Sequence, residues 1–227
     1  MDLYQGLHPW PRSAAEARVI QKQLPRPALP LTSSGHRVRF ILGLDCAFPR
    51  NIAPFAVAAA ALWDMATKQA VRIWRHRART PIPYVPGLLG FREVPLMLAV
   101  LELVDHSVDA ILVDGQGRAH PKRLGSASHL ALWLAEPVPV IGVAKTRLVG
   151  EFEPLLAEAG ASTPLIDRGE VIGQVLRSKG NCQPLFISSG GYIDTDGALA
   201  TARDSVCGYR LPEPIRLADQ AAGQPWH

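Results

Sequence analysis

The chain is poor in cysteine and in long apolar runs. Its three cysteines, Cys46, Cys182 and Cys207, show no paired spacing. This usage is typical of a reducing compartment and argues against a disulfide framework or a zinc site. The longest apolar stretch, residues 53–63, contains Pro54 and is shorter than the roughly 18–20 residues of a membrane span. The N-terminus lacks a basic start followed by an apolar core, so we expect no secretory signal, no membrane partner and a cytoplasmic protein.

Charge and composition narrow the class only slightly. Apolar residues make up 48% of the chain and charged residues 19%, which is enough for a core and unlike a disordered protein. The net charge is +4 and the pI is about 9.2. Mild basicity is compatible with a nucleic-acid partner, but many soluble proteins share it.

The N-terminal third predicts a helix and three strands. A capping-box pattern at Ser13 and Glu16 opens a short helix that ends near Leu24, and a Pro-rich connector over 25–34 follows. The next segments alternate in the manner of an antiparallel meander, with a turn at 67–69. The predicted strands cover residues 38–48, 56–64 and 70–77.

Beyond Pro86-Gly87 the pattern changes to alternating helices and strands. Apolar residues recur at helical spacing at 94, 97, 98, 101 and 104. Strands are then expected over 110–114, 138–143 and 185–188, and helices over 126–134 and 194–206. The fold class is therefore α/β, with a mixed sheet (antiparallel meander plus parallel strands) flanked by helices. One domain over 1–227, with residues 1–36 as helix and connector, is the simplest account.

Asp45 lies inside the first predicted strand, opposite its apolar side chains. The even positions from 38 to 48 are all apolar, so Asp45 points to the other face, beside Gly43 and Ala47. Aspartate is depleted in strand interiors, and burying an unpaired carboxylate is costly. A salt bridge, a backbone hydrogen bond or a ligand must therefore compensate Asp45.

Asp114 ends the apolar strand over 110–114 and precedes Gly115-Gln116-Gly117. The carboxyl ends of strands face the binding crevice in open α/β sheets, and glycines let a ligand approach the backbone. A simple Asp-Gly turn is the alternative. Taken with Asp45, Asp114 predicts a divalent metal site, because Mg²⁺ prefers carboxylate oxygens. Two ions about 3.5–4 Å apart would stabilise the attacking and leaving oxygens of a phosphoryl displacement.

Two further carboxylates are less distinctive. Glu93 precedes Pro95, and proline favours the first turn of a helix. We therefore expect Glu93 near a helix N-terminus, where the dipole favours a carboxylate, although an ordinary helix-start glutamate fits equally. Asp219 by itself is compatible with a surface residue.

Six motifs together resemble the endonuclease V family, in the family's order and over about residues 37–220. They are Pro83-Tyr84-Val85-Pro86-Gly87 with Phe91-Arg92-Glu93, Val113-Asp114-Gly115-Gln116-Gly117, His120-Pro121-Lys122-Arg123-Leu124-Gly125, Ala127-Ser128-His129, Ile141-Gly142-Val143-Ala144-Lys145 and Tyr209-Arg210-Leu211-Pro212-Glu213-Pro214.

The resemblance implies an RNase H-like fold and a Mg²⁺-dependent DNA repair endonuclease, with Mn²⁺ as a substitute. Such an enzyme cleaves the second phosphodiester 3′ to deoxyinosine, and inosine in RNA is a further expected substrate. Asp45 and Asp114 match the metal-binding aspartates. Glu93 and Asp219 match the other acidic positions of the catalytic site.

The resemblance also assigns substrate contacts. Lys145 matches a catalytic lysine near the scissile phosphate, and Tyr84 matches the wedge that holds the strands apart while the base is turned out. Gly115 and Gly117 would lie against that base, and His120 near the backbone around it.

Physical reasoning supports the wedge. Prolines at 81, 83 and 86 stiffen an extended loop with Tyr84 at its tip. Turning a base out costs roughly a few kcal/mol of unstacking, and an aromatic side chain can replace part of the lost stacking. A packed loop anchor is the alternative for Tyr84, and a solvated strand end for Lys145. His129 falls on a predicted helix face, so we expect it to be structural.

One segment departs from the family pattern, and two rival hypotheses bear on function. The family usually has a Gly-His pair and a basic residue after its late strand, whereas Ser189-Gly190-Gly191-Tyr192 stands here. One rival is a catalytically silent nucleic-acid-binding module, against which the complete acidic quartet speaks. The other is a metal nuclease of different specificity, such as a repair-excision incision domain; the tyrosine wedge and residues 210–214 argue against it.

Overall fold

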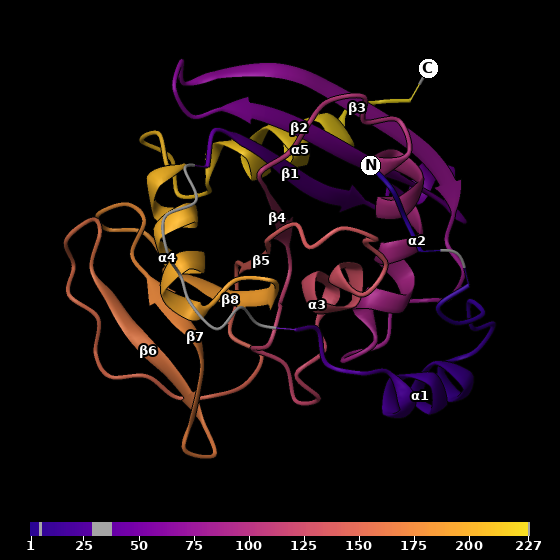
Figure 1. Ribbon diagram of the computed structural model, residues 1–227, viewed down its shortest axis with the longest axis horizontal. Coiled ribbons are helices and arrows are strands. Elements are labelled where there is room, and N and C mark those ends of the chain that lie inside the picture. The colour runs from indigo at the N-terminus through magenta and orange to yellow at the C-terminus, as the bar shows by residue number, and fades with distance from the viewer. Residues whose placement is uncertain (5, 29–37, 227) are drawn as a thin grey trace.

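A computed structural model describes residues 1–4, 6–28 and 38–226, and within them eight strands form one mixed sheet (Figure 1). The order across the sheet is β3-β2-β1-β4-β5-β8-β7-β6. The strands are β1 (Phe40–Ala47), β2 (Phe55–Asp64), β3 (Gln69–Arg79), β4 (Ala110–Asp114), β5 (Val140–Ala144), β6 (Ser162–Asp167), β7 (Glu170–Leu176) and β8 (Leu185–Gly191).

The pairing confirms the predicted mixed sheet. Strands β1, β2 and β3 form an antiparallel meander, and β4 and β5 continue from β1 in parallel. Strands β8, β7 and β6 then add in antiparallel fashion. The three parallel strands therefore lie in the middle, where their carboxyl ends share one edge.

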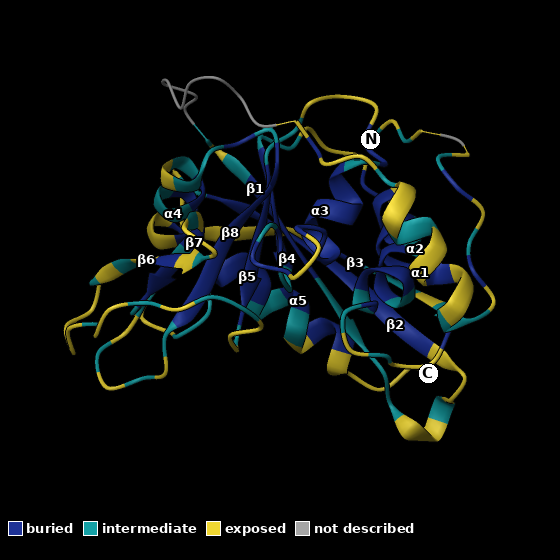
Figure 2. Ribbon diagram, turned by 90° about the horizontal axis from the view of Figure 1, so that it is seen from below, coloured by how far each residue is buried: buried dark blue, intermediate teal, exposed yellow. Residues whose placement is uncertain are grey.

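Helices cover both faces of the sheet. They are α1 (Ala14–Gln23), α2 (Leu89–Leu101), α3 (Ser126–Ala131), α4 (Thr195–Asp204) and α5 (Glu213–Gly223), with a short 3-10 helix η1 (Arg50–Ile52). Leu42 and Leu44 pack with residues of α2 and α3, whereas Ile41 packs with residues of α4 and α5. The central strands are buried between the layers, and exposed residues lie on the outer helix faces (Figure 2). No helix in the described ranges is long and apolar enough to cross a membrane.

The predicted helix ends hold where capping residues specify them. The Ser13 hydroxyl accepts a hydrogen bond from the Glu16 amide at 3.2 Å, and the Glu16 carboxylate accepts one from the Arg12 amide at 2.9 Å. Asp194 caps α4 by accepting from the Gly197 amide at 2.7 Å. Of the predicted connector over 25–34, residues 29–34 lie outside the described residues.

The expectation that Pro95 occupies the first turn of its helix is wrong. Helix α2 begins at Leu89, so Pro95 lies inside it and Glu93 is not at the dipole-favoured end. A proline in this position removes its own N–H hydrogen bond to the carbonyl four residues earlier. The apolar residues buried on both sides of it, including Val94 and Leu96, outweigh that loss.

The β6–β7 hairpin was not predicted, although its turn carries a local signal. Arg168 and Gly169 both adopt positive φ, at 55° and 76°. Two such residues form the tight turn that best matches the twist of a hairpin. The sequence does not indicate this turn clearly, because arginine rarely adopts a positive φ.

Helix α5 was also missed, and it covers the face to which Asp45 points. Two prolines near its start concealed it, although Pro214 lies in its first turn, where proline is well tolerated. The helix approaches β1 so closely that a Cβ at Gly43 would lie 2.2 Å from the Pro214 carbonyl carbon. Gly43 therefore allows α5 to lie directly on the sheet beside Asp45.

Candidate active site

Three aspartates converge at the carboxyl ends of the parallel strands. Leu44 of β1 pairs with Val113 of β4, so the next residues in register are Asp45 and Asp114. Asp219 reaches them from α5. One carboxylate oxygen from each of the three lies within 4.8 Å of the other two, a spacing at which a single metal ion can be held.

Glu93 approaches the same strand ends from α2. Its side chain is buried, and one carboxylate oxygen accepts a hydrogen bond from the Ser126 hydroxyl at 3.1 Å. Burial raises the pKa of Glu93 to about 8; the Ser126 hydrogen bond opposes this shift, and the charges of Asp45 and Asp114 add to it. The cluster of Asp45, Glu93, Asp114 and Asp219 is called the acidic cluster below.

The acidic cluster is short of positive charge. Burial raises the pKa of Asp45 to about 8, with a further contribution from the charge of Asp114. Burial raises the pKa of Asp114 as well. Carboxylates in this state gain from a bound cation, because the cation compensates both burial and mutual repulsion.

Lys145 lies inside this cluster and is not a solvated strand end. Asp114 pairs with Val143 of β5, and Lys145 follows two residues later on the same face. Its ammonium nitrogen lies 2.5 Å from Asp114 Oδ2 and 2.9 Å from Asp219 Oδ1. Burial lowers the pKa of Lys145, but the Asp114 and Asp219 carboxylates outweigh burial and raise it, so the side chain is a cation.

A cavity of about 320 Å³ opens beside the strand ends. The predicted site residues that line it are Asp45, Tyr84, Glu93, Asp114, Gly115, His120 and Lys145. Tyr84 is 60% exposed, so it stands at the surface of the molecule and is not a packed loop anchor. The cavity thus brings carboxylates, one cation and an exposed aromatic side chain together at one edge of the sheet.

A family model for endonuclease V matches residues 26–220 of the chain. The chain belongs to the endonuclease V family. The fold agrees with this assignment: the endonuclease V of Bacillus subtilis is 30% identical with a TM-score of 0.85, covering 98% of this chain and 95% of that one. The Streptomyces avermitilis enzyme is 35% identical with a TM-score of 0.80, covering 94% and 92%.

A third solved structure shows the same fold at lower identity. It is the endonuclease V of Ciona intestinalis, 21% identical with a TM-score of 0.75, covering 92% of this chain and 93% of that one. That protein was solved with a 24-mer DNA containing an inosine followed by a ribo-adenosine.

The two glycines after Asp114 differ in their surroundings. Gly115 lines the cavity, and a Cβ there would lie 3.4 Å from the Ser126 side chain. Gly117 is not among the residues that line the cavity: its Cβ position lies 2.2 Å from the Ser189 carbonyl oxygen. Gly117 therefore packs on β8, and its contact with a base stays a prediction.

Strand β8, which includes most of segment 189–192, is hydrogen-bonded to the loop that follows Asp114. Ser189 belongs to β8, and its carbonyl accepts a hydrogen bond from the Arg118 amide at 2.8 Å. The Ser188 hydroxyl accepts one from the Gly117 amide at 2.9 Å. In this member of the family the late strand thus fixes the backbone that follows Asp114.

His120 is a buried and neutral member of the site. Burial lowers its pKa to about 4, although the Gly87 carbonyl opposes that shift. Its Nδ1 accepts a hydrogen bond from the Lys122 amide at 3.1 Å, so the ring proton is on Nε2. His120 therefore has a donor directed towards the wedge loop at Gly87.

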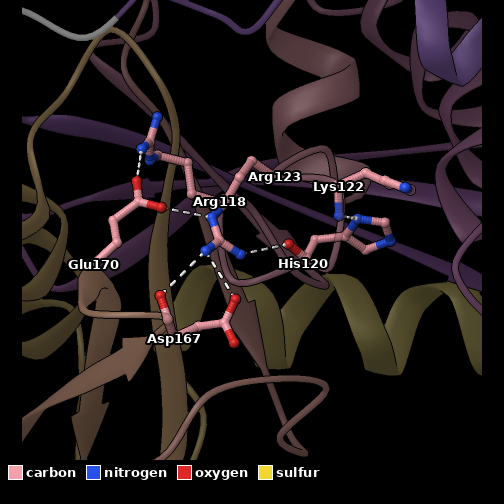
Figure 3. A network of polar contacts seen from close by, with 6 residues as sticks. All are labelled: Arg118, His120, Lys122, Arg123, Asp167 and Glu170. Atoms are coloured by element: carbon pink, nitrogen blue, oxygen red, sulfur yellow. Dashed lines mark hydrogen bonds and ion pairs between the residues drawn. The ribbon is translucent and has the colours of Figure 1, made fainter.

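A network of two arginines and two carboxylates braces the loop that carries His120 (Figure 3). Arg123 lies 2.9 Å from Glu170 and 2.8 Å from Asp167, and Arg118 also pairs with Glu170. Arg123 donates to the His120 carbonyl at 3.1 Å. Because both carboxylates belong to the β6–β7 hairpin, this hairpin network connects the missed element to the site.

Helix α1 supports the wedge loop in a way the sequence did not reveal. Gln21 Nε2 donates a hydrogen bond to the Gly87 carbonyl at 2.9 Å. Ile82, Leu88 and Phe91 form one buried cluster with Ala17 of the same helix. Gln21 and Ser126 are thus site residues that no local pattern marked.

His129 packs in an aromatic cluster, which agrees with the structural role expected of it, and it also lines the cavity. It is buried, with its Nε2 2.8 Å from His8 Nε2, and Trp10 and Trp133 flank the pair. Burial lowers the pKa of His129 to about 3, so the pair is neutral and one ring donates to the other.

Proposed function

We propose that the chain is a Mg²⁺-dependent endonuclease that hydrolyses the second phosphodiester bond 3′ to an inosine in DNA. The observation that carries this proposal is the convergence of Asp45, Asp114 and Asp219 at one edge of the sheet, with oxygens within 4.8 Å of one another. The related protein of the same fold that was solved with inosine-containing DNA supports the substrate class.

The donor set fits a hard divalent cation. All three candidate ligands offer carboxylate oxygens. Mg²⁺ and Mn²⁺ prefer oxygen ligands, whereas softer metals prefer thiolate or imidazole. Asp45 and Asp114 would hold the ion, and Asp219, which is more exposed, would complete the site from its open side. A bound divalent ion polarises the phosphodiester and lowers the pKa of an attacking water.

The chain's own residues then supply positioning and proton transfer. Glu93 lies outside the three-oxygen group, so it suits orienting a water. A cation held by the aspartates would oppose the shift that raises the pKa of Glu93 and leave its carboxylate free to accept the water's proton. The water oxygen forms a bond to phosphorus while the bond to the leaving oxygen breaks. Lys145 neutralises charge that develops on the phosphate. No covalent enzyme intermediate is required.

Recognition of the lesion would combine the wedge and the cavity. Tyr84 would occupy the space that the base leaves in the stack, and the cavity of about 320 Å³ would receive the base. The backbone at Gly115, approached closely because no Cβ is present, would contact the base edge. The neutral His120 donor keeps the wedge loop in register with the cavity.

The test is a cleavage map. Purified protein with Mg²⁺ is incubated with end-labelled DNA and RNA oligonucleotides that contain one inosine, and with adenosine controls. We expect one cut at the second phosphodiester 3′ to the inosine, lost in EDTA and restored by Mn²⁺. A cut elsewhere, or equal cutting of the adenosine control, would overturn the specificity.

A silent nucleic-acid-binding module is the second candidate. It predicts binding to inosine DNA with no cut in Mg²⁺ or Mn²⁺. The intact acidic cluster argues against it, because four clustered carboxylates repel a polyanion and would stabilise nothing in a protein that only binds one.

A further inference from the structure

The segment that leads into the wedge carries only positive charge. Residues 65–92 contain six Lys or Arg residues and no Asp or Glu. The segment contains β3, an edge strand of the sheet, and the end of β3 runs directly into the wedge loop. The charge is therefore displayed along one border of the molecule, next to Tyr84.

The arginines of β3 differ in whether their guanidinium groups have polar partners within the fold. Arg72 forms an ion pair with Asp105 at 2.7 Å. Arg75 donates to the Gln224 carbonyl at 2.6 Å and lies over the Trp226 ring. Arg77 and Arg79 are exposed, and neither forms an ion pair with any carboxylate in the described part of the chain.

An exposed aromatic ring lies beside these two arginines. Phe55 pairs with Arg79 across β2 and β3, and the Arg77 guanidinium lies 4.7 Å from the Phe55 ring centroid. Phe55 is 39% exposed. Guanidinium groups interleaved with an aromatic are typical of surfaces that follow a nucleic-acid backbone.

The register places this patch on the same sheet face as Asp45. Asp45 pairs with Ala59, which pairs with Arg75; two residues further on, Ala47, Val57 and Arg77 form the next row on that face. With about 4.8 Å between strands and 3.4 Å per residue, the Cα atoms of Arg77 and Asp45 are roughly 12 Å apart. Along the axis of a B-form duplex, at about 3.4 Å for each base pair, that corresponds to roughly three to four nucleotides.

A pair of hydrogen bonds links the end of β3 to the neighbouring chain segment. Thr80 follows Arg79, and both its amide and its hydroxyl donate to the Pro54 carbonyl at 3.0 Å. This contact fixes the end of β3 to the segment before Phe55. Arg77, Arg79 and Phe55, called the β3 patch below, therefore lie together where the chain leaves β3 for the wedge loop.

We propose that the β3 patch binds phosphates of the substrate flank, three to four nucleotides from the scissile bond. This inference rests on the proposed function only for the location of the scissile bond. The patch would add two phosphate contacts and align the duplex arm with the acidic cluster. It predicts that the enzyme needs an arm of a minimum length on one side of the lesion.

Edge protection is the competing account of the same residues. Charged side chains on an edge strand discourage pairing with a second molecule. Val71 and Ile73 on the same strand are exposed and apolar, so this role is physically reasonable. The two accounts differ in what the arginines change: nucleic-acid affinity or self-association.

The experiment compares wild type with R77A/R79A, using R72A as the matched control. R72A removes an arginine from the same strand whose charge is already paired. Affinity is measured by fluorescence anisotropy in EDTA for inosine-containing and inosine-free duplexes whose arms are shortened in single-nucleotide steps on either side. A salt series gives the slope of log affinity against log salt concentration.

We expect R77A/R79A to bind long-armed duplexes roughly tenfold more weakly and to lower the salt slope by about 1.8, the value for two phosphate contacts. Wild type should lose affinity when one arm falls below about four nucleotides, and R77A/R79A should lose that dependence. R72A should match wild type. R77K/R79K, which keeps the charges, should restore the salt slope.

Two outcomes would overturn the proposal. One is that the R77A/R79A protein is folded but shows the same salt slope and arm-length dependence as wild type, whether or not it self-associates in sedimentation experiments. The other is an equal loss in R72A, which would show a general charge effect. Failure of the proposed function appears differently, as equal handling of inosine-containing and inosine-free duplexes by wild type, and leaves the arm-length test intact.

Discussion

Two ionic clusters meet at the loop over residues 115–125, and they differ in charge balance. The acidic cluster sets four carboxylates against the single ammonium of Lys145. The hairpin network sets two guanidinium groups against two carboxylates. Burial raises the pKa of Asp45, whereas the hydrogen bonds from Arg123 and Arg118 lower that of Glu170.

The difference in charge balance distinguishes a candidate ion-binding site, the acidic cluster, from a structural support, the hairpin network. A balanced network has its charges satisfied by partners within the fold, so its members gain nothing from a further ion. An unbalanced cluster keeps carboxylates in an unfavourable state that a cation relieves, and such perturbed groups are typical of functional sites. The four predictions below test this contrast.

The largest effect is expected from Asp45→Ala. Losing a principal metal ligand removes several kcal/mol of transition-state stabilisation, about a thousandfold in rate. Nicking of an inosine duplex in Mg²⁺ measures it. Glu170→Gln, which removes a carboxylate from the hairpin network, should keep the rate within a few-fold. Full nicking by Asp45→Ala would contradict the metal assignment.

The next effect is on stability and belongs to the hairpin network. Arg123→Ala leaves Asp167 and Glu170 without their shared partner, at a cost of roughly 2–3 kcal/mol in the free energy of unfolding. Urea denaturation measures this loss. Arg72→Ala breaks only an exposed pair and should cost less than about 1 kcal/mol. Equal losses in both variants would show that the network is no stronger than a surface pair.

Asp219→Ala should give a milder defect than Asp45→Ala. Asp219 is the most exposed of the three aspartates, so its removal should lower the rate about tenfold and raise the Mg²⁺ concentration for half-maximal activity. Asp219→His should keep part of the activity, more readily with Mn²⁺, because imidazole is the softer ligand. A wild-type rate and metal dependence would reduce the site to the other carboxylates.

The smallest effect is a pH-dependent difference in melting temperature without metal. The pKa of Asp45 is 3.8 in the unfolded chain and about 8 in the folded one. The stability that the protonated carboxyl contributes is therefore fully present below pH 3.8 and is lost as the pH rises through 8. Asp45→Asn should therefore become more stable than wild type across that range, by a few degrees.

Glu170→Gln should show the opposite trend. The pKa of Glu170 is lowered from 4.5, so the stability that wild type gains over this variant is present above pH 4.5 and fades as pH falls. Scanning fluorimetry in EDTA at several pH values measures the difference in melting temperature between wild type and each of the two variants. Parallel trends would mean that the clusters do not differ in charge balance.

The sequence predicted most of the central sheet because its signals are local. The alternation around Asp45, the short apolar strand before Asp114 and the cap at Asp194 each depend on a few neighbouring residues. These elements appear close to their expected bounds. Glu93 was placed correctly in a helix but at the wrong position, because a proline was taken to mark the helix start.

The rest of the site depends on contacts between distant segments. The partnership of Asp219 with Asp45 requires α5 to cross β1, and only the close approach at Gly43 permits it. The bracing of His120 requires the β6–β7 hairpin, more than forty residues later in the chain. Gln21 reaches the wedge across 66 residues. No local pattern encodes such pairs, so only the family resemblance indicated any of the residues involved.

The position of Asp219 on α5 has a consequence for how the protein is made. A ribosome releases Asp45 and Asp114 well before residues 213–223, and domains form as synthesis proceeds. Until α5 docks on Gly43, the nascent chain has two of the three converging aspartates and no contact between Asp219 and Lys145. On the proposed function, a partly synthesised chain would hold metal less firmly, and full activity would follow the docking of the C-terminal helix.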